Sequence, residues 1–152
     1  MTDALRSLIE SAPDRSAEDI AATLRGLGSP VVDGTSVTFL FHGAAEAVLL
    51  QHFVYGIPTA QPFQRVAGTE LWYFTLELPR ASRVEYKLAV EIGGRRAWIR
   101  DPLNPHLAFD PFGANSVCYG AGYEPPQWTL EDPESRSGRI EEHRVPSDAY
   151  GG

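Results

Sequence analysis

The chain has 152 residues, of which 43% are hydrophobic and 22% charged, a balance typical of one folded globular domain. Its formal net charge of −7 argues against sequence-independent binding to nucleic acid, because such binding needs Lys and Arg to replace the counterions of the phosphates. No apolar run approaches the roughly 20 residues that a membrane helix requires. We therefore expect neither nucleic acid nor a membrane as a partner.

One cysteine, Cys118, is present, so the sequence predicts no intramolecular disulfide and favours a reducing compartment. Cys118 lies in an alternating apolar run with no basic neighbour, which favours a buried side chain over a reactive thiol. The first six residues lack the basic segment and apolar core of a signal peptide. These features together predict a cytoplasmic protein.

Residues 1–28 have the periodicity of two short helices. The apolar positions at helical spacing are Leu5, Leu8 and Ile9 in the first helix and Ile20 and Leu24 in the second. Pro13 ends the first helix, and Ser16 provides an N-cap for the second. Gly26 and Gly28 are expected to end the second helix.

From residue 31 to residue 119 the period of apolar residues changes to two, which is typical of strands with one face on a core and one in solvent. The clearest runs are Val37–Phe41, Trp72–Leu78, Tyr86–Ile92 and Asn115–Tyr119. Repeated short strands separated by turns predict a mainly-β sandwich over residues 29–120. The prolines and mixed charge of residues 121–152 predict a linker or extended arm, in which Trp128 pins the arm to the sandwich.

Gly93 and Gly94 predict a two-residue hairpin loop, because a type I′ turn needs a positive φ at both positions. The loop sets the register of its two strands, from Ile92 opposite Arg95 to Lys87 opposite Arg100. The residues that then share the core face are Leu88, Val90, Ala97 and Ile99.

Trp98 falls on the opposite, solvent face of this hairpin, together with Lys87, Arg96 and Arg100. A tryptophan among charged side chains on a solvent face is unusual. These four residues form the predicted ligand-binding or domain-binding site. The alternative is that the N-terminal helices or the arm simply cover Trp98.

Three stretches resemble the N-terminal domain of the enterochelin-esterase-like, or siderophore-esterase, hydrolases. They are Gly28–Val32 leading into Val37–His42, then Arg65–Trp72, then Asp101–Pro105 followed by Phe112–Val117 and Gly122–Trp128. The resemblance implies an immunoglobulin-like, early-set sandwich that precedes an α/β-hydrolase domain in the same polypeptide. It implies a non-catalytic domain that docks on or gates that hydrolase, because the catalytic G-x-S-x-G motif is absent from this chain.

The stretch Gly138–Val145 resembles the start of the first hydrolase strand, so we expect a fragment that stops just before the enzyme begins. In such a hydrolase, arginines near the active site could attract an anionic ferric siderophore, and Arg96 and Arg100 are the candidates. The sequence leaves the oligomeric state open.

A second resemblance concerns the glycogen-binding carbohydrate modules, which share the early-set fold. It runs from Tyr86–Leu88 through Trp98 to Asp101–Pro102. It implies that Trp98 stacks on a sugar ring and that Lys87 donates to sugar hydroxyls. The second tryptophan of that family, expected in the segment 54–66, is absent here, and Val54–Pro58 contains only Tyr55 as an aromatic side chain.

Catalysis, a metal site and a cofactor are not expected within the chain. Its four histidines, His42, His52, His106 and His143, show neither the H-x-E nor the H-x-x-x-H spacing of metal ligands. Cys118 has no second cysteine with which to bind a metal ion.

Overall fold

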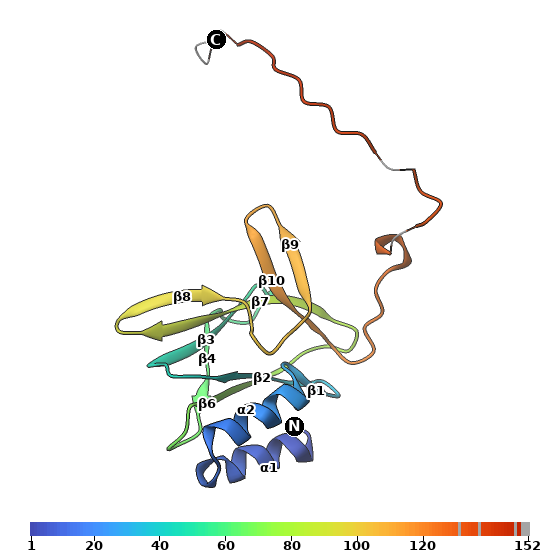
Figure 1. The fold of residues 1–152 in the computed structure, drawn as a ribbon. Helices are drawn as coiled ribbons and strands as arrows, with labels where there is room; N and C mark the ends of the chain where they lie inside the picture. Colours follow the sequence, from blue (N-terminus) through green and yellow to red (C-terminus); the bar gives the residue numbers. More distant parts are fainter. Residues whose placement is uncertain (131, 137, 148, 150–152) are drawn as a thin grey trace.

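The computed structural model describes residues 1–130, 132–136, 138–147 and 149. Two antiparallel sheets face each other across an apolar core, and the two N-terminal helices cover the outer face of one sheet (Figure 1). The predicted mainly-β sandwich with a helical N-terminus is thus confirmed. No helix in the described ranges has both the length and the hydropathy needed to cross a bilayer.

The helices are α1 (Asp3–Ser11), the short 3₁₀ turn η1 (Ala12–Asp14) and α2 (Ala17–Leu27). The hydroxyl of Ser16 accepts a hydrogen bond from the Asp19 amide at 3.1 Å, so Ser16 caps α2 as predicted. Gly28, with φ of +71°, ends α2. The expectation that Gly26 also ends this helix is wrong, because Gly26 lies inside α2.

The first sheet has the order β1-β2-β6-β5. Its strands are β1 (Val31–Asp33), β2 (Ser36–His42), β5 (Gln64–Arg65) and β6 (Leu71–Glu77). The second sheet has the order β4-β3-β7-β10-β9, and β8 also pairs with β7. Its strands are β3 (Ala47–His52), β4 (Gln61–Pro62), β7 (Arg83–Ile92), β8 (Arg95–Ile99), β9 (Leu107–Asp110) and β10 (Gly113–Tyr119).

The space between the sheets is filled by apolar side chains, with Phe39 and Tyr86 packed edge to face at 4.9 Å between ring centroids. Trp72 lies in this core. Cys118 is also buried there, as predicted. Burial raises the pKa of the Cys118 thiol to about 12. The thiol therefore stays protonated at neutral pH.

A second apolar cluster lies between the helices and the outer face of the first sheet. Leu5, Leu8 and Leu24 pack there against Leu40 of β2 and Leu71 of β6. Strand β2 is therefore buried on both faces. The expectation of one solvent face per strand is wrong for β2, because the helices occupy the place of solvent.

Two further residues that were expected to be packed, Ala97 and Trp128, are exposed. Ala97, predicted to face the core, is exposed because β8 pairs only with β7 at the sheet margin, whereas Ile99 is half-buried against the core. Trp128, in the 3₁₀ turn η2 (Gln127–Thr129), is 85% exposed and does not pin the arm. The described residues beyond Tyr123 run away from the sheets (Figure 1).

Candidate functional site

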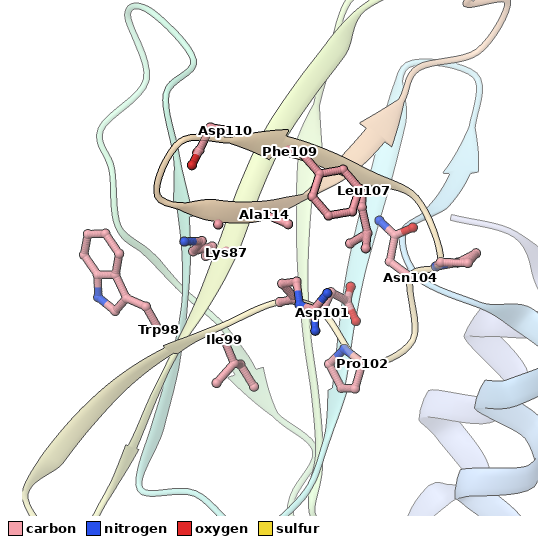
Figure 2. Close-up of a pocket in the computed structure, with 13 residues that line it drawn as sticks. Lys87, Trp98, Ile99, Asp101, Pro102, Asn104, Leu107, Phe109, Asp110 and Ala114 are labelled. Atoms are coloured by element: carbon pink, nitrogen blue, oxygen red, sulfur yellow. The ribbon is translucent and has the colours of Figure 1, made fainter. Parts of the chain in front are cut away.

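The longest strand, β7, shares one of its edges between two other strands. Its first half pairs with β10 and its second half with β8, while β3 occupies the opposite edge. The β7–β8 hairpin and the β9–β10 hairpin therefore diverge from a common origin (Figure 1). A groove of about 1080 Å³ lies between them (Figure 2).

The β7–β8 hairpin that forms one wall has the register that the sequence predicted. Gly93 and Gly94 have φ of +57° and +69°, and Ile92 lies opposite Arg95. Trp98 lies opposite Ala89 and is 57% exposed. The alternative that helices or arm cover Trp98 is therefore wrong for the described residues.

Aromatic side chains stand on both walls of the groove. Trp98 belongs to one wall and Phe109, which is 81% exposed, to the other (Figure 2). Leu107 and Ala114 extend the apolar surface of the second wall. Exposed aromatic side chains on two walls of one groove suit a ligand or partner that is partly apolar.

The groove carries charged side chains of both signs, with Asp101 buried in its floor and Asp110 at its rim. Lys87 and Arg100 line it, and neither forms an ion pair with another described residue. Arg96 differs, because its Nε atom donates to Glu91 Oε1 at 2.7 Å and its side chain does not line the groove. The structure thus brings together Lys87, Trp98 and Arg100 and leaves Arg96 outside.

A buried carboxylate, that of Asp101, stabilises the floor of the groove. Asp101 is 2% exposed, and its Oδ2 atom accepts hydrogen bonds from Ser29 Oγ and Tyr86 Oη, each at 2.7 Å. Its Oδ1 atom accepts from the Leu103 amide at 2.9 Å. Burial raises the pKa of Asp101, and these hydrogen bonds partly offset the rise.

Asn104 completes this network. Its Nδ2 atom donates to Tyr86 Oη and to the Val117 carbonyl, each at 2.9 Å, and its Oδ1 atom accepts from the His106 amide at 2.9 Å. Asp101 and Asn104 thus satisfy amides of their own turn, those of Leu103 and His106. The bonds to Ser29 and Tyr86 were missed, because these partners are distant in sequence. The network makes the Asp101–Pro105 turn a firm floor.

A smaller hollow of about 160 Å³ adjoins the groove behind Trp98. It is lined by Gln51, Phe53, Lys87, Trp98, Asp110 and Asn115. Phe53 is 78% exposed and was not singled out from the sequence. The signal was available, since Phe53 follows the inward-facing His52 and alternation places it outward. Tyr55, in the same loop, is fully exposed.

The four histidines lie in separate places. His52 is buried in the sandwich, His42 is half-buried under α2, and His106 packs edge to face on Tyr119 at 5.1 Å. His143 lies in the arm beside Glu141. Among the residues that the structure describes, no three His, Cys, Asp or Glu side chains are grouped so that they could hold a metal ion.

Comparisons with known proteins find the fold but no family. No family model and no curated protein matches the chain. Among solved structures, it resembles enterochelin esterase from Shigella flexneri with a TM-score of 0.52 and 21% identity, over 75% of this chain and 39% of that one. It resembles ferric enterobactin esterase from Salmonella typhimurium with a TM-score of 0.51 and 19% identity, over 66% and 35%.

Pullulanase from Bacillus acidopullulyticus is also similar, with a TM-score of 0.51 and 15% identity, over 62% of this chain and 12% of that one. The chain shares its fold with a part of each of these enzymes. It spans little more than a third of the length of the two esterases. At such identities the likeness concerns the fold alone, and the function must be argued from the groove.

Proposed function

We propose that this chain is a non-catalytic accessory domain of an enterochelin-esterase-like serine hydrolase, and that the groove docks on or gates the catalytic domain. The observation that carries the proposal is the exposure of Trp98 and Phe109 around Lys87 and Arg100, which have no ion pair among the described residues. The likeness to two esterases supports it. Trp and Arg are the residues most enriched at the centres of protein interfaces.

In this proposal the chain has three parts. Residues 1–28 brace the first sheet, residues 29–120 form the sandwich, and residues 121–152 lead to a hydrolase domain in the same polypeptide. The parent enzyme would cleave a siderophore ester in the cytoplasm, in keeping with the printed names of the similar esterases and with the single, buried Cys118. Lys87 and Arg100 would then be the groups that contact an anionic ferric siderophore at the domain boundary.

The backbone of β8 offers a further docking element. With Ile92 opposite Arg95 across a two-residue loop, the hydrogen-bonded pairs are those of Arg95, Ala97 and Ile99. The N–H and C=O groups of Arg96 and Trp98 consequently point to the open edge of the sheet. An extended segment of the hydrolase domain could add there as a strand.

Two experiments test this proposal. The first is the reading frame that follows Gly152 in the native gene: an α/β-hydrolase sequence with G-x-S-x-G supports the proposal, and an immediate stop codon sinks it. The second is hydrogen exchange on the full polypeptide, in which the amides of β8 should exchange more slowly than in the isolated chain.

A matched pair of variants sharpens the second experiment. Arg100 lines the groove and Arg96 does not, although both flank Trp98 on the same strand face. Arg100→Ala should therefore weaken the added protection of β8 in the full polypeptide, while Arg96→Ala should leave it unchanged. Equal effects of the two variants would contradict docking through the groove.

The alternative function is glycan binding of the glycogen-binding type. The observation that favours it is the exposed Trp98 beside Lys87, with a further exposed aromatic side chain, Phe53, lining the same hollow. The likeness to a pullulanase supports it. Retardation of the chain in a gel containing glycogen, lost in Trp98→Ala, would favour this alternative. No retardation of either protein would favour docking.

A further inference from the structure

The loop between β3 and β4, residues 53–60, carries two exposed aromatic side chains next to the groove. Phe53 lines the hollow behind Trp98, and Tyr55 stands free in solvent. The loop contains no charged residue and contributes no long strand pairing. Its position therefore depends on the few hydrogen bonds at its two ends.

Both ends of the loop are held at one residue, His52. The Nδ1 atom of His52 accepts a hydrogen bond from the Val54 amide at 3.1 Å. The His52 amide donates to Thr59 Oγ1 at 3.2 Å, and the Gln51 side chain donates to the same oxygen at 2.9 Å. One imidazole thus fixes where the loop begins, and the neighbouring backbone fixes where it ends.

The imidazole can form this bond in one protonation state only. A backbone N–H always donates, so Nδ1 must carry a lone pair, and the ring must be neutral with its proton on Nε2. His52 is 1% exposed, and its Nε2 atom has no hydrogen-bond partner among the described residues. With a proton on Nδ1, that N–H and the Val54 N–H would face each other as two donors without an acceptor. The protonated ring would also place a charge without an ion-pair partner in the core.

Among the described residues, no acidic side chain faces His52 to compensate such a charge, and only the Pro58 carbonyl favours the protonated ring. On β7 its partner is Tyr86, while Arg83, Glu85 and Lys87 alternate with Tyr86 and so belong to the outer face. Inside the core the titratable groups are Tyr86 and Cys118, whose pKa values are raised by burial, so both stay neutral at physiological pH. Asp101 is hydrogen-bonded to the far end of Tyr86.

We propose that His52 is a pH-operated latch on the loop 53–60. Neutral His52 holds Phe53 beside Trp98 and Lys87, and protonated His52 releases the loop and opens the hollow. The latch would regulate the surface of the proposed function, so its role rests on that surface binding the hydrolase domain. The latch itself rests only on the geometry of His52.

The direction of the pH response follows from burial. Desolvation lowers the pKa of His52 below 6.5, and the Pro58 carbonyl opposes the shift only in part. By linkage, protonation raises the equilibrium constant for loop opening about ten-fold for each unit by which the closed-loop pKa lies below the open-loop pKa. The loop is thus held closed while His52 is neutral and opens as the pH falls through the lowered pKa of His52.

The test is NMR of the isolated chain between neutral and mildly acidic pH, with the His52 ring protons and amide protection factors followed together. The protection factor of the Val54 amide should fall as His52 is protonated, by about ten-fold for each unit that separates the closed-loop pKa from the open-loop pKa. The amide of Val48, in the middle of β3, should keep its protection. Constant Val54 protection while His52 titrates would overturn the latch, and so would a His52 pKa at or above 6.5.

His52→Asn is the matched variant. The asparagine Oδ1 atom can accept the Val54 amide in place of Nδ1, but it does not titrate, so Val54 protection should no longer depend on pH. A variant that shows the same loss as the wild type would overturn the proposal. Should His52→Asn fail to fold, the coincidence of the two midpoints in the wild type decides. A working latch with no docking in the full polypeptide would overturn the proposed function alone.

Discussion

The two sheets of this sandwich have similar alternating sequences but different surroundings. The outer face of the first sheet, with Leu40 and Leu71, is covered by α1 and α2. The outer face of the second sheet exposes Trp98 and Lys87 to a groove. Alternation therefore tells which residues share a face, but not whether that face meets protein or solvent. The candidate site lies on the sheet that has no helical cover.

The largest expected effect tests this contrast directly. Leu40→Ala should reduce the free energy of unfolding by about 2–5 kcal/mol, because it leaves a cavity between β2 and the helices. Trp98→Ala, on the uncovered face, should change it by no more than about 1 kcal/mol despite removing a larger side chain. Urea unfolding of the two variants gives both values. Equal losses of unfolding free energy would mean that the outer faces of the two sheets are equally buried.

The second prediction concerns the network that connects the sheets. Ser29 Oγ accepts from the Leu40 amide of the first sheet at 3.1 Å and donates to Asp101, which Tyr86 of the second sheet also reaches. Asp101→Asn should lower the unfolding free energy by about 1–3 kcal/mol, because one buried donor loses its acceptor. Asp110→Asn, at the exposed hairpin tip, is the control for unfolding by urea and should have little effect.

The third prediction compares two glycines. A Cβ atom at Gly120 would lie 2.6 Å from Ser82 Oγ and 3.0 Å from the Pro79 carbonyl, so Gly120→Ala should destabilise the second sheet by about 1–3 kcal/mol. Gly26 lies inside α2 with nothing within 4 Å of such an atom. Gly26→Ala should therefore stabilise the helical cover by about 0.5–1 kcal/mol. Thermal melting checks both predictions. A melting temperature lowered in both variants would contradict the open surroundings of Gly26.

The smallest expected effect is a pH dependence of the unfolding free energy that arises from His52 in the second sheet. The pKa of His52 is lowered in the folded state, so its contribution to stability is complete above 6.5 and is lost as the pH falls through the folded-state pKa. His52→Asn should remove this part of the pH profile measured by urea unfolding. Leu40→Ala should lower the whole profile and leave its shape unchanged.

Much of the fold could be predicted from short stretches of sequence. Ser16 caps a helix by a bond to an amide three residues on, and Gly93 with Gly94 sets a register that runs along both adjoining strands. These features are local, so the residues that determine them are adjacent in the chain. The exposure of Trp98 followed from the same register.

The groove itself required the tertiary structure. Strand β9 was not foreseen, and only its hairpin with β10 places Phe109 opposite Trp98. The bond between Ser29 and Asp101 joins residues 72 positions apart, which no sequence period encodes. Sequence alone thus determined the side chains on each strand face, because backbone geometry repeats over two residues. Which faces meet helix, sheet or solvent was decided by long-range packing.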